Sequence, residues 1–335
     1  MQLSFLSNLN SEENNIKYFS DDNGVLSLMY HRFNENKYPS TNIRMNIFKD
    51  QMQIIKNLDY SFSDPNFFVS RFNKPKNKKE ILITIDDGFK SFYTEAWPYL
   101  KKNKIPFILF VSTEPVGKNG YMDWNEIKEI EKMDFAVIGH HSHTHEYLID
   151  MNNSDFKKDI EVASKIFKEK LGYVPEIFSY PFGEYSQYMK EYISKNFKVA
   201  FGQHSGVIDI NKDKFELPRF PINEKYGDLK RFKSLINYLP LEYEKLSPEQ
   251  KKLDSKDNPP KIIVKFFPEQ KNIEKINCYS NDGGDWNKPN LNFKEQILEI
   301  NLKKKFLPRR GRINCSLNDN GNWRWFGTQF TIQKN

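Results

Sequence analysis

Two groups of side chains in this sequence could hold a metal ion and activate water. The first is an adjacent carboxylate pair, Asp86 and Asp87, which directly follows an apolar run at residues 80–85. Neighbouring carboxylates at the end of a buried strand repel each other and are costly to desolvate, and a nearby cation relieves that cost. Because successive side chains of an extended segment point to opposite sides, one carboxylate could bind the ion while the other faces the water. An Asp-Asp-Gly turn without any ligand explains the same residues, so the pair alone is a weak signal.

The second group is rich in histidine. Four of the six histidines of the chain lie within residues 139–145, which read GHHSHTH. His141 and His145 are four residues apart, so one helical turn or a tight loop places both imidazoles on one side. Two imidazoles and one carboxylate are a ligand set typical of zinc, and they leave an open position for water. A solvated His-rich loop is the alternative. The metal site is favoured because this group, like the Asp pair, follows a strand.

Together these motifs resemble those of the polysaccharide deacetylases of carbohydrate esterase family 4. The resemblance covers residues 25–239 and is carried by four segments: TIDDGF at 84–89, MDW at 122–124, HSHTH at 141–145 and YPFG at 180–183. It implies a metal-dependent hydrolase that removes N-acetyl groups from a polysaccharide or glycan.

The resemblance also implies roles for individual residues. Asp86 corresponds to the general base, and the metal ligands correspond to Asp87, His141 and His145. The implied cofactor is a divalent cation, Zn²⁺ by default, with Ni²⁺ or Co²⁺ as substitutes. The other histidines of the loop, at positions 140 and 143, are then neighbours of the site and not ligands.

Two departures from the usual family pattern narrow the resemblance. The third motif normally contains an Arg that orients the base, but residues 179–182 read SYPF, and Arg219 is our candidate replacement from another strand. The general acid is normally a late His, whereas here LMYHRF places His31 after the first strand. Both departures resemble the circularly rearranged branch that contains the poly-N-acetylglucosamine deacetylases. His204, in FGQHSG, is the rival acid, although a loop or core role suits it better.

Three aromatic residues are expected to contact the substrate: Trp124, Tyr180 and Phe182. The backbone N–H of Phe182 would also stabilise an oxyanion, since that role needs no particular side chain. A plain core role is the alternative for Trp124. Three more tryptophans near the C-terminus could stack on sugar rings or form the core of a small domain, and we expect the core role: Trp286, Trp323 and Trp325.

The elements that must position these residues alternate between strand and helix. Apolar runs typical of strands lie at residues 26–30, 80–85, 107–111, 135–138 and 177–180, and helical spacing occurs at 47–57 and 155–171. The candidate site residues follow the strands directly, as they do in an α/β barrel, whose site is built from the loops after the strands. Because the spacing is irregular, we predict a distorted (β/α) barrel with fewer than eight regular repeats.

A polar, charged segment that ends in two prolines, residues 246–258, predicts a linker. It would divide a catalytic domain at residues 1–245 from a small basic β-sandwich at residues 259–335, in which strand-like runs alternate with Asn/Gly/Asp turns. Cys278 and Cys315 both fall in this small domain. Either a disulfide in an oxidising compartment or two buried thiols would explain them.

The charge and composition of the chain limit the kinds of partner that it could bind. The chain has 335 residues, 38% hydrophobic and 15% aromatic, which is globular composition. Residues 259–335 hold 14 Lys and Arg against 7 Asp and Glu, so the whole net charge of +7 lies there. An anionic glycan or a membrane surface could bind this basic face, an ordinary solvated surface is the alternative, and nucleic acid is not expected.

No apolar stretch approaches the roughly 20 residues that span a bilayer, and no export signal is visible. A cytoplasmic protein and one that has lost its export signal both fit, and we favour a periplasmic or extracellular location. Two rival functions stay open: a non-catalytic glycan-binding protein on a deacetylase scaffold, and an O-acetyl esterase. The intact Asp, His and His set argues against the first.

Overall fold

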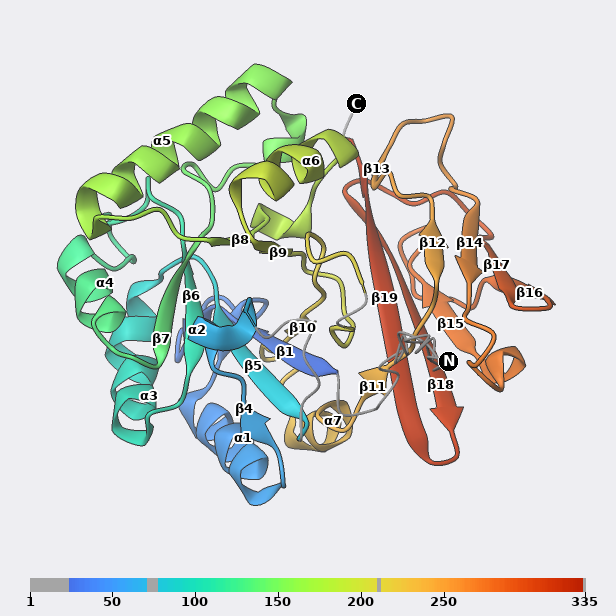
Figure 1. The fold of residues 1–335 in the computed structure, drawn as a ribbon, viewed down its shortest axis with the longest axis horizontal. Coiled ribbons are helices and arrows are strands. Elements are labelled where there is room, and N and C mark those ends of the chain that lie inside the picture. Colours follow the sequence, from blue (N-terminus) through green and yellow to red (C-terminus); the bar gives the residue numbers. More distant parts are fainter. Residues whose placement is uncertain (1–23, 71–77, 210–211, 334–335) are drawn as a thin grey trace, which may run out of the picture.

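The computed structural model describes residues 24–70, 78–209 and 212–333 (Figure 1). A sheet of eight strands, all paired in parallel, occupies the first part of the chain. Its order is β10-β1-β5-β6-β7-β8-β9, and β4 pairs with β5. The strands are β1 (Val25–Tyr30), β4 (Ser61–Phe62), β5 (Glu80–Ile85), β6 (Phe107–Val111), β7 (Ala136–His140), β8 (Ile177–Ser179), β9 (Val199–Phe201) and β10 (Phe220–Pro221).

Helices surround the outer side of this sheet (Figure 1). They are α1 (Met45–Asn57), α2 (Pro65–Phe68), α3 (Trp97–Asn103), α4 (Trp124–Glu131), α5 (Asn153–Leu171), α6 (Gln187–Asn196) and α7 (Leu229–Leu235). Single turns of 3₁₀ helix lie at Leu148–Asp150, Pro181–Gly183 and Ile273–Lys275, and one π-helical turn, Phe92–Ala96, precedes α3. Two short strands, β2 (Arg32–Phe33) and β3 (Asn42–Ile43), pair with each other.

The central strands are mostly apolar because both faces of the sheet are covered. All six residues of β1 are buried, as are the last five of β5. Helix α5 begins where the side chain of Asn152 accepts hydrogen bonds from two backbone N–H groups of its first turn, and it ends at Gly172, whose φ is 88°. The local sequence therefore accounts for both kinds of element: apolar runs form the buried strands, and capping residues set the ends of a helix.

The predicted distorted barrel is confirmed. The strand path starts at β10 and ends at β9, and a parallel bridge joins Phe201 of β9 to Leu217, just before β10. Strands β4 and β10 have only two residues each, which accounts for the irregular spacing in the sequence. The carboxyl ends of the parallel strands meet at one end of the barrel, where the candidate site lies.

Two mainly antiparallel sheets pack together in the C-terminal part, which confirms the predicted sandwich; only β11 and β13 pair in parallel, both with β19. One has the order β11-β19-β18-β15, with β13 beside β19, and the other has the order β12-β14-β17-β16. Their strands are β11 (Leu239–Pro240), β12 (Lys245–Ser247), β13 (Lys252–Leu253), β14 (Ile262–Lys265), β15 (Asn277–Ser280), β16 (Asn290–Lys294), β17 (Ile297–Asn301), β18 (Arg310–Asp319) and β19 (Asn322–Ile332). A disulfide joins Cys278 of β15 to Cys315 of β18, so the disulfide alternative holds.

The segment predicted as a linker, residues 246–258, is partly paired in the sheets. It contributes part of β12 and all of β13, which pair with β14 and β19. Earlier still, β11 pairs with β19, so the chain enters the C-terminal sheets before residue 246. Polar and charged side chains suggested a loop, but the backbone of this segment satisfies its hydrogen bonds in the edges of the sheets. The boundary between the two domains stays a prediction.

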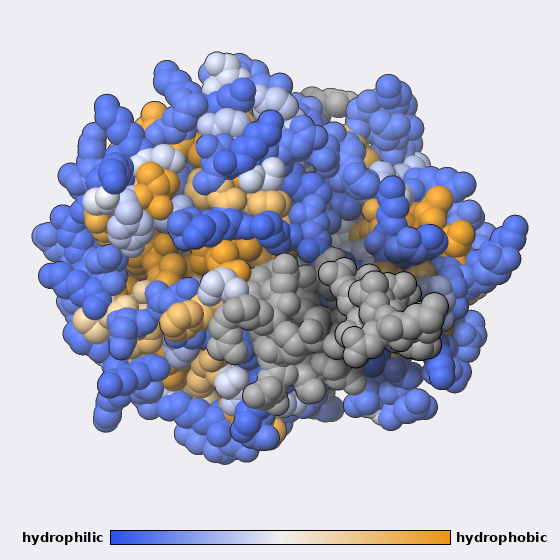
Figure 2. Space-filling model, in the orientation of Figure 1, coloured by the Kyte–Doolittle hydropathy of each residue, from blue (hydrophilic) through white to orange (hydrophobic). Residues whose placement is uncertain are grey.

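The outer surface is mainly hydrophilic on the face shown in Figure 2, in keeping with a mean hydropathy of −0.74. Two of the C-terminal tryptophans are not core residues, because Trp286 is 48% exposed and Trp323 is 45% exposed. Trp325 is partly buried and stacks on Tyr238. Within the described ranges, no helix combines the length and the apolar character needed to cross a membrane.

Candidate metal centre

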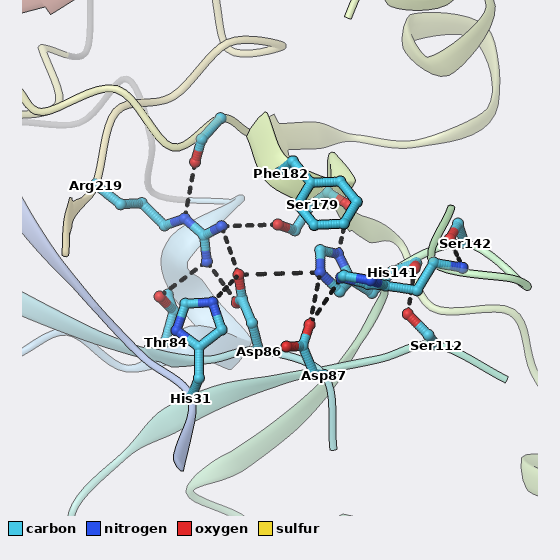
Figure 3. A network of polar contacts seen from close by, with 12 residues as sticks. His31, Thr84, Asp86, Asp87, Ser112, His141, Ser142, Ser179, Phe182 and Arg219 are labelled. Atoms are coloured by element: carbon cyan, nitrogen blue, oxygen red, sulfur yellow. Dashed lines mark hydrogen bonds and ion pairs between the residues drawn. The ribbon is translucent and has the colours of Figure 1, made fainter. Parts of the chain in front are cut away.

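The predicted site residues converge from five places in the sequence (Figure 3). Each lies in a loop after a parallel strand or just before the last one, so the barrel brings them to one end. His31 follows β1, Asp86 and Asp87 follow β5, His141 and His145 follow β7, Phe182 follows β8, and Arg219 precedes β10. The fold thus brings together residues that are more than 100 positions apart in the sequence, such as Asp86 and Arg219.

Three atoms form the centre of this site. Asp87 Oδ1 lies 2.9 Å from His145 Nε2 and 3.3 Å from His141 Nε2, and all three atoms lie within 4.8 Å of one another. Each is buried and, within the described part of the chain, has no hydrogen-bond partner. Two nitrogens and one oxygen that face one another without donors to satisfy them are the surroundings that a divalent cation requires.

The tautomer of His141 suits a ligand. Its Nδ1 lies 2.7 Å from the backbone oxygen of Ser179, and this contact makes Nδ1 the donor and leaves the lone pair on Nε2. Burial alone would raise the pKa of Asp87, but the charge of His145 and the nearness of both imidazoles hold that pKa well below its ordinary value. The carboxylate is therefore ionised at neutral pH.

The backbone at the site is strained. Asp87, Ser142, His145 and Phe182 all have positive φ, between 56° and 75°, although none is glycine. Such residues cost roughly 1–3 kcal/mol each and persist only where the surroundings hold them. The buried carboxylate of Asp159 in α5 accepts hydrogen bonds from three groups of the histidine loop: His143 N, Thr144 N and Thr144 Oγ1.

The other two histidines of the loop contribute no atom to the cluster. His140 is fully buried, its Nδ1 accepts a hydrogen bond from Ser142 N, and burial lowers its pKa to about 3. His143 instead places its Nδ1 2.8 Å from Thr113 Oγ1. Both side chains therefore form hydrogen-bond contacts that stabilise the loop, and neither belongs to the cluster.

Asp86 and Arg219 form a fully buried ion pair beside the cluster. Arg219 NH1 donates to Asp86 Oδ1 at 2.6 Å, and NH2 donates to Oδ2 at 2.8 Å. The remaining guanidinium donors bond to Gly202 O, Thr84 Oγ1 and Ser179 Oγ, so all five are satisfied. Burial would raise the pKa of Asp86, but the charge of Arg219 outweighs it and the pKa lies below its ordinary value.

The two candidate acids lie in different surroundings. His31 Nε2 is 3.9 Å from Asp86 Oδ2, and its side chain keeps 13% exposure. His204 is buried and lines a small cavity between the barrel and the C-terminal sheets, together with Tyr185, Glu216 and Tyr243. Burial lowers the pKa of His204 to about 4. None of the predicted ligands lines that cavity, so the geometry brings only His31 beside Asp86.

Comparison with known proteins agrees with this geometry. Residues 73–199 match the family model for polysaccharide deacetylase. This segment of the chain is therefore similar to a polysaccharide deacetylase domain. A curated relative, the poly-beta-1,6-N-acetyl-D-glucosamine N-deacetylase of Staphylococcus epidermidis, is 23% identical over 243 residues, which are 64% of this chain and 83% of the relative. The protein of the same name from Staphylococcus aureus is 23% identical over 232 residues, 61% of this chain and 80% of the relative.

Solved structures show the same fold as the deacetylase domain. The structure of IcaB from Ammonifex degensii has a TM-score of 0.56 at 24% identity and covers 64% of this chain and 97% of its own. The Streptococcus pyogenes deacetylase PplD, solved in complex with acetate, has a TM-score of 0.58 at 20% identity, with 64% and 98% covered. The predicted resemblance is thus confirmed at the level of the domain and its fold.

The three aromatic residues that we predicted to contact substrate lie in different surroundings. Phe182 lies at the site, with its ring edge-on to His145 at 4.9 Å. Tyr180 was wrongly predicted to contact substrate: it is fully buried and stacks on Tyr185 at 4.7 Å, because its side chain points to α6 and not to the site. Trp124 is partly buried and packs edge-on against Phe167 of α5, and its contact with substrate stays a prediction.

Our sequence predictions also missed aromatic residues that border the candidate site. On one side Tyr147 stacks on Phe182 at 4.1 Å. On the other side Arg32 lies 3.4 Å from the ring centre of Phe89, which packs on Tyr121. Burial and the charge of Asp87 raise the pKa of Tyr121, which places it near the cluster. These residues could have been suspected because they adjoin the motifs in the sequence. Arg32 directly follows His31 in HRF, and Tyr121 directly precedes MDW in YMDW.

Proposed function

We propose that this protein is a metal-dependent enzyme that removes N-acetyl groups from a polysaccharide. The observation that carries the proposal is the cluster of unpartnered ligand atoms of Asp87, His141 and His145 beside the buried pair of Asp86 and Arg219. A binding protein has no need of a buried ionised carboxylate held at the edge of a ligand cluster. The names of the relatives support an N-acetylglucosamine polymer as the substrate class.

Asp87, His141 and His145 would hold a divalent cation, and their mixed nitrogen and oxygen donors suit Zn²⁺, with Ni²⁺ or Co²⁺ as substitutes. When bound, such a cation would supply Lewis acidity for the acetyl carbonyl and for the attacking water. Three protein ligands leave room for water and substrate, as a catalytic site needs.

Asp86 is suited to take the proton of the attacking water at Oδ2. That oxygen lies 4.0 Å from His141 Nε2 and 3.9 Å from His31 Nε2, so it faces the space between ligands and candidate acid. Because its pKa is lowered, Asp86 is ionised and ready to accept a proton at neutral pH. Arg219 holds the carboxylate through two hydrogen bonds, which is the role of the Arg missing from the third motif.

His31 would protonate the amine nitrogen as the bond between carbonyl carbon and nitrogen breaks, and acetate and the free amine are the products. Burial lowers the pKa of His31, although the charges of Asp87 and Asp86 oppose this, so the imidazole is largely neutral at neutral pH. It would therefore first take up the water proton from Asp86 and then pass it to the nitrogen. The N–H of Phe182, in the turn after β8, would donate to the oxyanion.

Replacement of the two candidate acids separates them. We expect His31→Gln to lower kcat by about 10²-fold or more, within the range of general acid–base catalysis. We expect His204→Gln to leave kcat within about 2-fold, because His204 lines a different cavity. Steady-state rates of acetate release, with thermal unfolding as the control for folding, check both. A large loss of kcat in the His204 variant alone would transfer the acid role to that residue.

The disulfide between Cys278 and Cys315 supports a periplasmic or extracellular location, since such bonds persist in oxidising compartments. An extracellular site of action also suits a polysaccharide substrate. The exposed Lys303, Lys304 and Lys305 could hold an anionic glycan or a membrane surface near the enzyme.

Acetate release tests the proposed function directly. Metal-loaded protein should release acetate from β-1,6-linked N-acetylglucosamine oligomers and leave O-acetylated sugars at matched concentration nearly untouched. Faster release from the O-acetyl substrates would make the protein an esterase. Tight binding of glycans without any acetate would favour the non-catalytic alternative.

A further inference from the structure

The turn that carries Phe182 is held by the C-terminal sheets. Gln329 of β19 donates from Nε2 to the backbone oxygens of Phe182, at 3.2 Å, and of Gly183, at 3.1 Å. Its side-chain oxygen accepts a hydrogen bond from Arg312 Nε at 2.9 Å, which turns the amide nitrogen toward the turn. Gln329 is only 3% exposed, so water does not compete for these bonds. Figure 1 shows β19 beside the barrel.

This turn needs support from outside itself. Phe182 has a φ of 59° and Gly183 a φ of 68°. A left-handed Phe costs roughly 1–3 kcal/mol unless its surroundings hold it. At Gly183 a Cβ would lie 2.4 Å from the backbone nitrogen of Gln203, so the turn is packed tightly against the next loop. Bonds to two successive carbonyl oxygens fix both peptide planes that follow Phe182.

A second contact, from the residue just before β18, reaches the same turn. Arg309 donates from NH2 to Glu184 at 2.8 Å and from NH1 to Asp150 at 2.7 Å. Its guanidinium lies 3.7 Å from the ring centre of Tyr147, and Tyr147 stacks on Phe182. Because Phe182 in turn contacts the ligand His145, a continuous row of contacts runs from β18 to the cluster.

We infer that Gln329 is a positioning residue for the deacetylation reaction, and that the C-terminal sheet completes the site by fixing the Phe182 turn. The inference rests on the proposed function. An oxyanion donor acts only when it is aimed at the developing charge, so a loosened turn lowers transition-state binding more than substrate binding. The loss therefore falls on kcat, while KM and metal content stay constant.

The variant Gln329→Met tests this role. Methionine keeps the length of the side chain and removes both hydrogen bonds to the turn, so the fold is preserved as far as a substitution allows. We expect kcat to fall about 10- to 100-fold, with KM and metal content within about 2-fold of the unmodified protein. Amide hydrogen exchange should speed up at residues 182–184 and stay unchanged in the rest of the barrel.

Gln250→Met is the matched control. Gln250 also joins the C-terminal part to the barrel, because its side-chain oxygen accepts from the backbone N–H of Gln187 in α6, away from the turn. This variant should keep kcat and the exchange rates at 182–184. An equal loss of kcat in both variants would reduce Gln329 to a general contact between the parts of the chain, and unchanged exchange at the turn would overturn the inference.

The exchange measurement separates this inference from the proposed function. If the unmodified, metal-loaded protein releases no acetate from any N-acetylated glycan, the proposed function fails. Exchange at residues 182–184 still decides, in that case, whether Gln329 orders the turn. If acetate is released and Gln329→Met keeps full kcat, the function stands and the positioning role is wrong.

Discussion

Asp86→Asn is expected to lower kcat by about 10³-fold or more while the protein still binds its metal. The carboxamide cannot accept the proton of the attacking water, and general base catalysis commonly contributes 10²–10⁴-fold. Asp86 offers no atom to the ligand cluster, so the cation should bind as before. Acetate release and metal content, measured on the same preparation, check the expectation. Full activity of the variant would remove Asp86 from the role of base.

Stability is the main confounding effect in that experiment. Removing the charge of Asp86 leaves the fully buried Arg219 without its counter-ion, and such a change can cost about 3–5 kcal/mol. Asp282→Asn is a suitable control, since Asp282 is 1% exposed and accepts hydrogen bonds from the backbone of Lys303 and Lys304, far along the chain in the C-terminal sheets. Its kcat should stay unchanged even where its unfolding temperature falls.

His145→Ala is expected to weaken metal binding by at least about 100-fold and to abolish acetate release at ordinary metal concentrations. One of three protein ligands is lost, and even the loss of a residue that only supports a ligand costs about 10–100-fold. Titration of metal-free protein with Zn²⁺, followed by calorimetry, measures the change. Excess metal should restore part of the activity, because the base and the candidate acid are still in place.

His143→Ala is the control within the same loop. His143 contacts Thr113 and contributes no atom to the cluster, so the variant should bind Zn²⁺ within about 5-fold of the unmodified protein. A loss of affinity equal to that of His145→Ala would show that the loop, and not the ligand atom, is what the substitution damages. Equal retention in both variants would contradict the proposed ligand set.

Local sequence was sufficient for the barrel strands and for the residues of the candidate cluster. The run at residues 80–85 is apolar and β-branched, and β5 has the same bounds. Asp87, His141 and His145 follow such strands, so the rule that the carboxyl ends of parallel strands meet predicted that they lie together. The small sandwich in the C-terminal part could likewise be predicted, from short runs separated by turns.

Side-chain direction was harder to predict. Tyr180 and Phe182 are two residues apart, and we assigned both to the substrate groove. The strand ends at Ser179 and the chain turns at Pro181, so Tyr180 points into the core while Phe182, with its positive φ, points to His145. The segment at residues 246–258 misled us similarly, because its polar side chains conceal backbone pairing in β12 and β13.

The chemistry proposed for this protein follows from the sequence alone, because two carboxylates and two histidines at the ends of apolar runs favour a metal site. Only the tertiary structure decided which groups surround that chemistry. Arg219 reaches Asp86 across 133 positions, and the sequence offered it only as a candidate. Gln329 reaches Phe182 across 147 positions, and nothing in its local sequence distinguishes it from other polar residues. A short motif records what a residue can do, whereas its partners depend on which distant strands the packing of the core brings beside it.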